Sequence, residues 1–194
     1  LRERGIDVID PDEGSLASKG EHGVGRLPDP VELLTRVEAA LAGIGADTAK
    51  DLAGLKVLVT AGGTREPIDP VRFIGNRSSG RMGFAIAAAA RDAGATVQLV
   101  AGPVGLATPA GVERIDVRSA RQMRDAVIQR AAANDIFIAA AAVGDYRPEA
   151  CAPHKLKKSG KPLALELIQN PDILAEVSAL PDRPFLVGFA AETE

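Results

Sequence analysis

The stretch Lys56-Val-Leu-Val-Thr60 decides the predicted fold. Its apolar centre is typical of a strand buried in a parallel sheet, because such strands are covered on both faces. A long connection follows, and then an alanine-dense segment from Gly80 to Ala93 whose composition favours a helix. The order of strand, connection and helix indicates an α/β protein.

The same alternation continues toward the C-terminus. Further strands are predicted at residues 96–100, 112–117, 135–141 and 184–189, with another candidate at 163–168. Helices are predicted at residues 119–133, where Ser119 is the N-cap, and at residues 170–180. Continuous apolar strands that alternate with helices predict a Rossmann-like, open, mostly parallel sheet with helices on both faces.

The N-terminal part of the chain has a different character, because glycine, proline and charged residues are mixed there. A short strand is predicted at Ile6–Ile9, and residues 14–28 are predicted to form a loop. Asp29 and Pro30 are typical of the N-cap and first position of a helix, which is predicted to run to Ala42. Residues 43–53 are then expected to be a linker.

The composition excludes several protein classes. Of the 194 residues, 46% are apolar and 25% are charged, which is ordinary for a globular protein and unlike a disordered chain or a coiled coil. The net charge of −3 argues against a general nucleic-acid or membrane-surface binder. No apolar run is long enough to span a membrane. Cys151 is the only cysteine, so no internal disulfide can form and a reducing, cytoplasmic location is expected.

The connection after the first strand, residues 61–83, is a candidate anion site. It is far longer than the ~2–6 residues usual in α/β units, and it lies at the sheet edge where such proteins bind ligands. Ser78, Ser79 and Gly80 precede the helix, where hydroxyls and free N–H groups can hold an anion at its positive end. The alternative is that Ser78 simply caps the helix. The connection matches neither the dinucleotide pattern nor a Walker A loop.

Three later segments could contribute to the same edge. Asp145 follows the strand at 135–141 and could accept hydrogen bonds from a sugar or base, or could be a turn residue. Residues 155–161 carry four lysines, which suit phosphates, although most such runs are solvated surface. Asn170-Pro-Asp172 begins a helix with Asn170 as its cap; its amides offer a second anion site, but a plain cap is the simpler interpretation.

Two other functional classes remain as alternatives. A dehydrogenase on this fold would need an acidic residue at the end of the second strand to hold the ribose, and that strand ends Val100-Ala-Gly-Pro103. A short-chain dehydrogenase would also need a lysine four residues after its tyrosine, but Ala150 stands four residues after Tyr146. A non-catalytic binding or assembly module is the third class.

Six segments in order carry a family resemblance. They are Val59–Arg72, Asn76–Gly83, Ala140–Tyr146, Lys155–Lys158, Asn170–Ile173 and Gly188–Thr193. Residues 54–194 thereby resemble the phosphopantothenate–cysteine ligase half (phosphopantothenoylcysteine synthetase) of the bifunctional CoaBC family. The family carries further nucleotide-binding lysines beyond the last segment, so this domain is expected to be incomplete at its C-terminus and to bind CTP poorly as it stands.

Residues 1–42 resemble the end of the preceding flavin-dependent decarboxylase half of the same family. Asp12-Glu-Gly14 and Gly23-Val-Gly-Arg-Leu27 carry that match. Where the family reads Ala-Cys-Gly-Asp, this chain has Ser18-Lys-Gly-Glu21. Most of that half is absent, and the chain begins with Leu1 in place of methionine, so we expect a piece of a longer protein that does not itself decarboxylate.

The resemblance implies CTP-dependent ligation of 4′-phosphopantothenate with L-cysteine in coenzyme A biosynthesis. In that reaction the carboxylate becomes an acyl-cytidylate with release of pyrophosphate, and the amine of cysteine then forms the amide of phosphopantothenoylcysteine. Mg²⁺ is expected on the triphosphate, and FMN only in the largely missing decarboxylase half. The resemblance also implies a homodimer in which the lysine-bearing loop approaches the partner's site.

The resemblance assigns roles to individual residues. Asn76 would orient the acyl intermediate for attack by the amine, and Lys155 would stabilise the charge that develops on the leaving pyrophosphate. Ser78 and Gly80 would cradle a phosphate. The positions that would bind CTP are Ala139, Ala140, Ala141, Asp145, Lys155, Asn170, Pro171, Asp172, Ile173 and Phe189. The resemblance implies no particular metal ligands.

Overall fold

The computed structural model describes residues 9–15, 22–26, 28–42, 50–160 and 162–190. The chain divides into two compact units, residues 1–48 with 190–194, and residues 49–189. The assignment of residues 1–42 and 54–194 to a decarboxylase and a ligase domain stays a prediction.

Some sequence predictions fall outside the described residues. Of the strand predicted at Ile6–Ile9, only Ile9 is described, and it is not in a strand. Residues 43–49 of the predicted linker and the segment 18–21 are not among the described residues either.

The N-terminal unit contains a pair of strands and a helix. Strand β1 (Asp12–Ser15) pairs antiparallel with β2 (His22–Arg26), and helix α1 spans Pro30–Ala42. The prediction of a loop over residues 14–28 was therefore wrong for the strand residues, because these glycine-rich strands lack the apolar alternation that indicates a strand. The helix was predicted correctly, and the carboxylate of Asp29 caps it by accepting a hydrogen bond from the Val31 N–H at 2.9 Å.

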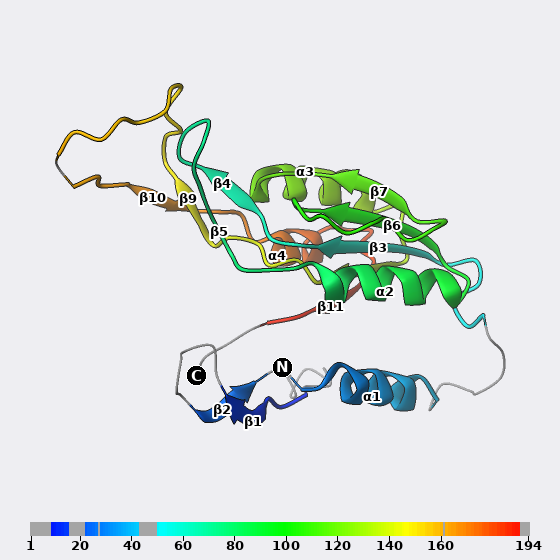
Figure 1. The fold of residues 1–194 in the computed structure, drawn as a ribbon. Helices are drawn as coiled ribbons and strands as arrows, with labels where there is room; N and C mark the ends of the chain where they lie inside the picture. Colours follow the sequence, from blue (N-terminus) through cyan, green and yellow to red (C-terminus); the bar gives the residue numbers. More distant parts are fainter. Residues whose placement is uncertain (1–8, 16–21, 27, 43–49, 161, 191–194) are drawn as a thin grey trace. The chain divides into compact units, whose positions relative to one another are not determined.

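The second unit is built on one parallel sheet of five strands in the order β11-β8-β3-β6-β7 (Figure 1). The strands are β3 (Lys56–Ala61), β6 (Thr96–Ala101), β7 (Glu113–Asp116), β8 (Ile136–Ala139) and β11 (Phe185–Gly188). Every neighbouring pair is parallel. The stretch that decided the predicted fold is the central strand, and the Rossmann-like fold is confirmed.

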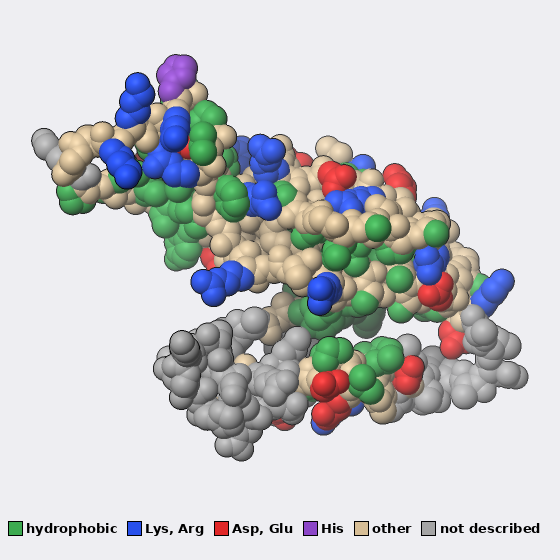
Figure 2. All heavy atoms as spheres, viewed as in Figure 1, with side chains coloured by type: hydrophobic (Ala, Val, Ile, Leu, Met, Phe, Trp, Pro, Cys, Tyr) green, Lys and Arg blue, Asp and Glu red, His purple; other side chains and the backbone are tan. Residues whose placement is uncertain are grey.

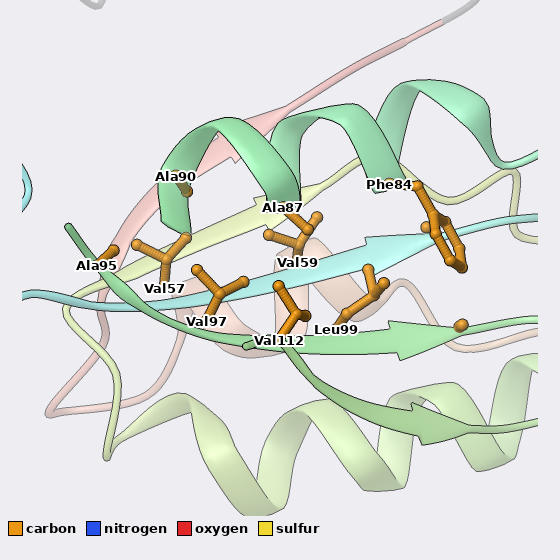
Figure 3. Packing of buried hydrophobic residues seen from close by; sticks show 11 residues of the cluster. Val57, Val59, Phe84, Ala87, Ala90, Ala95, Val97, Leu99 and Val112 are labelled. Carbon is orange, nitrogen blue, oxygen red and sulfur yellow. The ribbon is translucent and has the colours of Figure 1, made fainter. Parts of the chain in front are cut away.

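Helices cover both faces of this sheet. Helix α2 (Arg81–Asp92) packs on one face, and α3 (Ala120–Ala131) and α4 (Ile173–Ser178) pack on the other. Figure 3 shows Ala87 and Ala90 of α2 over Val57, Val59 and Val97 of the sheet. The alanines explain how a chain without tryptophan closes its core, because small side chains bring the helix backbone close to the sheet.

Short strands beyond the sheet were not predicted, apart from an overlap of the candidate at 163–168 with one of them. Strand β4 (Arg65–Pro67) pairs antiparallel with β5 (Phe73–Gly75), and β9 (Tyr146–Pro148) pairs antiparallel with β10 (Leu167–Gln169). These pairs and their connections, within residues 65–75 and 146–169, continue beyond the carboxyl edge of the sheet, and we call them the projection (Figure 1). Of the candidate strand at 163–168 only the last two residues are in β10. Three-residue strands give too short a pattern to recognise in a sequence.

No helix among the described residues combines the length and the apolar character that crossing a membrane requires.

We predict that Gly83→Ala lowers the free energy of unfolding by about 1–3 kcal/mol, more than any gain in helix propensity offsets. The added methyl group would lie 2.5 Å from Cβ of Ala61 and 2.9 Å from the Thr60 carbonyl oxygen, where α2 crosses β3. Urea denaturation followed by circular dichroism measures the change. Gly105→Ala is the matched control, because nothing lies within 4 Å of a Cβ there. Equal stability of the two variants would contradict the close packing.

Candidate functional site

The segments that follow β3 and β8 are joined beyond the end of the sheet. Gly63 and Ala142 form a parallel bridge. The Ala142 N–H donates to the Gly62 carbonyl at 2.8 Å, and the Thr64 N–H donates to the Ala142 carbonyl at 3.3 Å. Residues 60–64 and 139–145 therefore form one continuous stretch of joined backbone at the carboxyl edge, which we call the edge wall.

Two buried threonines hold the edge wall in place. The Oγ1 atom of Thr64 accepts a hydrogen bond from the Gly144 N–H at 2.9 Å, and that of Thr60 accepts one from the Ala141 N–H at 3.3 Å. Both side chains are about 2% exposed or less. The hydroxyls take the place of a backbone partner for the N–H groups of Ala141 and Gly144, since backbone N–H groups away from water need a partner. Sequence reasoning missed both threonines, although each lies where β3 ends.

Glycines let residues 76–80 and residue 102 approach the edge wall closely. A Cβ on Gly63 would lie 2.8 Å from the carbonyl oxygen of Asn76, and one on Gly102 would collide with the carbonyl oxygen of Gly63. Gly62 and Gly80 have φ angles of 80° and 75°, which favour glycine. The start of α2 is thus packed against the end of β3.

The start of α2 differs from the predicted alternative of a serine cap. Gly80 is the N-cap and makes no side-chain cap bond, although the Arg81 N–H donates to Oγ of Ser79 at 3.5 Å. Ser78 and Ser79 are exposed, and the Gly80 N–H donates to Oγ of Ser78 at 3.3 Å. The first turn also carries no acidic residue. These features suit an anion at the positive end of α2, and the phosphate role of Ser78 and Gly80 stays a prediction.

Two asparagines lie against the edge wall. Nδ2 of Asn76 donates to the Val143 carbonyl at 3.0 Å, and Nδ2 of Asn170 donates to the Gly144 carbonyl at 2.7 Å. The Asn170 N–H also donates to the Asp145 carbonyl at 2.7 Å. The prediction of Asn170 as a helix cap was wrong. Asp172 caps α4 by accepting from the Ala175 N–H at 2.9 Å, because Asn170 is engaged with the edge wall.

The structure therefore brings most of the predicted site residues together. Ala139, Ala140 and Ala141 are half-buried in the edge wall, and the carboxylate-bearing residue Asp145 is exposed at its end. Pro171 and Asp172 follow Asn170 directly, and the Phe189 N–H points to the Ala139 carbonyl at 3.4 Å. Ile173 is 7% exposed and packs in the core with α3, so its side chain serves packing.

Lys155 was predicted to belong to the site, but it lies away from the edge wall. It is exposed on the projection, where Figure 2 shows Lys and Arg side chains gathered. Within the part of the chain that the structure describes, no hydrogen bond or ion pair joins Lys155 to the edge wall. Its neighbour Leu156, in contrast, is firmly held, because its N–H donates to Oδ2 of Asp69 at 3.1 Å and its carbonyl accepts from Nη2 of Arg72 at 2.6 Å.

Asp69 is the centre of this clasp between the lysine segment and the connection after β3. Its buried carboxylate accepts hydrogen bonds from the N–H groups of Val71, Arg72 and Leu156 and from the Arg72 guanidinium. Burial by itself would raise the pKa of Asp69, but the Arg72 guanidinium and the three N–H groups hold that pKa well below its usual range. The clasp is therefore intact at neutral pH and is lost only as the pH falls through the lowered pKa.

A second buried carboxylate fixes the other side of the connection. Glu66 is 1% exposed, and its Oε1 accepts a hydrogen bond from the Ala120 N–H at 2.9 Å, at the start of α3. It thereby ties β4 to α3. Within the described residues no group of three or more His, Cys, Asp or Glu side chains is placed to hold a metal ion.

We predict that Asp69→Asn releases the lysine segment from the clasp and leaves the sheet intact. Trypsin cleavage at Lys155, Lys157 and Lys158 should become about tenfold faster, since the charge-assisted hydrogen bonds to Arg72 and Leu156 are weakened. Limited proteolysis with mass spectrometry measures the rates. Asp92→Asn is the control, because Asp92 pairs with Arg91 on an exposed part of α2. Unchanged cleavage in Asp69→Asn would contradict the role of the clasp.

Comparison with known proteins finds relatives that match the whole chain. The chain is 50% identical over 195 residues to the coenzyme A biosynthesis bifunctional protein CoaBC of Haemophilus influenzae, covering 100% of this chain and 47% of the relative. It is 51% identical over 197 residues to CoaBC of Vibrio cholerae, covering 100% of this chain and 48% of that relative. The chain thus spans about half the length of the curated relatives it matches.

Solved structures agree with the fold. The crystal structure of the C-terminal domain of CoaBC matches with a TM-score of 0.65 and 46% identity, covering 73% of this chain and 67% of that one. A DNA/pantothenate metabolism flavoprotein from Streptococcus pneumoniae matches in fold, with a TM-score of 0.61, 24% identity, and coverage of 69% of this chain and 68% of that one.

The family model described as the DNA/pantothenate metabolism flavoprotein C-terminal domain matches residues 52–194, which is most of the chain. The protein therefore belongs to the family of DNA/pantothenate metabolism flavoprotein C-terminal domains.

Proposed function

We propose that this chain is the ligase part of a CoaBC-like protein and that it joins 4′-phosphopantothenate to L-cysteine at the expense of CTP. The observation that carries the proposal is the edge wall with Asn76 and Asn170 against it, beside an uncapped helix start. The CoaBC relatives, which are 50% and 51% identical in sequence, support the same reaction, since their name places them in coenzyme A biosynthesis.

The nucleotide would lie along the edge wall. The half-buried alanines at 139–141 offer small apolar side chains for the cytosine to pack on, and the exposed Asp145 can accept hydrogen bonds from ribose hydroxyls. The triphosphate would then reach the start of α2, where the Ser78 hydroxyl can donate and the Gly80 N–H would exchange its 3.3 Å hydrogen bond to that hydroxyl for a phosphate oxygen. Phe189, which is 49% exposed beside Ala139, can pack against the base.

Asn76 suits the role of orienting the acyl group. An amide nitrogen carries two hydrogens, and the bond to the Val143 carbonyl uses one and fixes the direction of the other. That second N–H can hold the carbonyl oxygen of the acyl-cytidylate while the amine of cysteine attacks the carbonyl carbon. The bond from that carbon to the phosphate oxygen then breaks, CMP leaves, and the amine loses a proton.

Lys155 suits the preceding step. There a carboxylate oxygen of 4′-phosphopantothenate attacks the α-phosphorus of CTP, and the bond to pyrophosphate breaks. The ammonium of Lys155 would stabilise the charge that gathers on the leaving pyrophosphate. Mg²⁺, when bound, would neutralise part of the same charge, and we expect phosphate oxygens to supply most of its ligands because the described residues offer no cluster of carboxylates.

A homodimer is part of the proposal. Apolar side chains are exposed on the projection, which is typical of an interaction surface; they are Val71, Phe73, Tyr146, Leu163, Leu165 and Leu167. Lys155 lies on this projection, apart from its own edge wall, so in a symmetric dimer it would serve the partner's site.

The N-terminal unit is proposed to be the end of a decarboxylase half, for which FMN would be the cofactor. The family name and the bifunctional relatives support this assignment. A cytoplasmic location is proposed with it. No step of the ligation involves the flavin.

We predict that the full-length protein releases pyrophosphate from CTP only when 4′-phosphopantothenate is present, and faster than from ATP. Lys155→Ala should slow this release about 100-fold, whereas Asn76→Ala should preserve it and slow amide formation about 100-fold. Rapid-quench assays of pyrophosphate and product separate the two steps. Lys158→Ala, an exposed neighbour, is the control. Normal amide formation by Asn76→Ala, or nucleotide indifference, would refute these assignments.

We predict that inactive subunits complement each other. If Lys155 serves the partner's site, mixing Asn76→Ala with Lys155→Ala subunits gives heterodimers with one complete site, and about a quarter of the wild-type activity returns in a C₂ dimer. Mixing after mild denaturation and dialysis, followed by a product assay, measures the recovery. No recovery, with heterodimers verified by mass spectrometry, would place Lys155 in the site of its own chain.

A further inference from the structure

A hollow on the carboxyl edge lies outside the proposed nucleotide site. It opens between the ends of β6 and β7, strand β4 and the start of α3, with a volume of about 770 Å³. Ligand pockets commonly have volumes of about 300–1,000 Å³. Its lining includes Arg65, Val104, Arg114, Asp116, Arg118 and Gln122.

The lining is basic in a chain whose net charge is −3, because it holds three arginines and one aspartate. Arg114 is committed to structure. Its guanidinium donates to Oδ1 of Asp116 and to the Leu106 carbonyl, both at 2.8 Å, and lies 5.3 Å from the Phe84 ring. The Arg114–Asp116 pair is therefore neutral, and the positive charge that remains belongs to Arg65 and Arg118.

These two arginines lie side by side with most donors unused. The Arg65 N–H donates to the Arg118 carbonyl at 2.8 Å, which joins the two backbones, and both residues line the hollow. The Arg65 guanidinium lies 4.7 Å from the Phe73 ring, and its one hydrogen bond, to the Pro103 carbonyl, is 3.5 Å long. The Arg118 guanidinium has no hydrogen bond or ion pair with any other described residue.

The start of α3 lies beside the hollow, but its N–H groups are not the groups that would bind an anion there. The N–H groups of Ala120, Gln122 and Met123 already donate to Glu66, to the Ser119 side chain and to the Ser119 carbonyl, and Arg121 does not line the hollow. The side chains of Arg65 and Arg118 are therefore the groups that a ligand would contact. Two guanidinium groups with free, planar sets of donors match the oxygens of a phosphate group.

The hollow adjoins the start of α2. A Cβ on Gly62 or Gly80 would lie 3.0 or 3.1 Å from Cγ1 of Val104, which lines the hollow. One side chain thus separates the hollow from the place where the triphosphate is proposed to bind. An elongated phosphorylated ligand can extend past Val104 from one to the other.

We propose that Arg65 and Arg118 form a phosphate subsite of this protein. Two ligands of the proposed function carry that chemistry there: the phosphomonoester end of 4′-phosphopantothenate and the terminal phosphates of CTP. The identity of the ligand rests on the proposed function, whereas the phosphate chemistry of the hollow does not.

Titration calorimetry of the full-length protein tests the subsite with four probes: 4′-phosphopantothenate, pantothenate, CTP and inorganic pyrophosphate. The variants are Arg118→Gln, which removes an exposed charge, and Arg65→Gln. Arg121→Gln is the matched control, because it removes the same charge from the first turn of α3 without touching the lining. Arg118→Lys keeps the charge and should keep part of the affinity.

The expected result is that Arg118→Gln and Arg65→Gln weaken at least one phosphate probe about tenfold, and that Arg121→Gln does not. A loss for 4′-phosphopantothenate with unchanged pantothenate binding identifies the phosphomonoester, and a loss for CTP and pyrophosphate identifies the nucleotide. Equal affinities in Arg118→Gln and Arg121→Gln for every probe overturn the subsite. Pyrophosphate binding that depends on Arg118 in a protein without ligase activity would keep the subsite and reject the proposed function.

Discussion

The hydrogen bonds that join the segments after β3 and β8 are the constraint on which the carboxyl edge depends. Where two parallel strands end, their N–H and carbonyl groups lose partners and must find others. Here the Gly62–Ala142 bond and the hydroxyls of Thr60 and Thr64 supply them. Each bond contributes only about 0.5–1.5 kcal/mol net, but an unsatisfied buried group would cost about 1–3 kcal/mol, so arrangements of the edge wall that break these bonds are disfavoured. Asn76 and Asn170 then bond to carbonyls whose positions are already fixed.

The fold could be predicted because its signals are local and repeated. Val57, Leu58 and Val59 alternate between the two faces of β3, and each face is covered, so the run is apolar throughout. The site could be predicted only in part. Asn170 precedes a proline and a helix, which is the pattern of a cap, but its tertiary bond to Gly144 overrides that pattern. Asp69 and Glu66 gave no signal, because a carboxylate becomes buried only when segments distant in sequence meet around it.

The cations of the second unit fall into two groups. Arg72, Arg114 and Arg124 are held by carboxylates or carbonyls, and their charges shape the protein. Pairing raises the pKa of Arg124 through Glu176, on α4, and Asp125, which keeps that charge fixed between α3 and α4. Lys155 and Arg118 have no such partner among the described residues. The paired arginines stabilise local structure. The unpaired Lys155 and Arg118 remain available to bind anions.

The starts of the helices show the same distinction. Asp29, Ser119 and Asp172 each place a side-chain oxygen on the first turn of α1, α3 and α4. Helix α2 alone among the described helices with an assigned cap begins at a glycine, and Arg81 stands in its first turn where a positive charge is unfavourable. A missing cap typically costs about 1 kcal/mol. Glycine is favoured at position 80 by its φ of 75° and because a Cβ there would lie 3.1 Å from Cγ1 of Val104, so the N-cap position has no side chain to offer. The N–H groups of Gly80 and Arg81 donate only to the exposed hydroxyls of Ser78 and Ser79, at 3.3 and 3.5 Å, so a phosphate bound there would replace two long hydrogen bonds with charge-assisted ones.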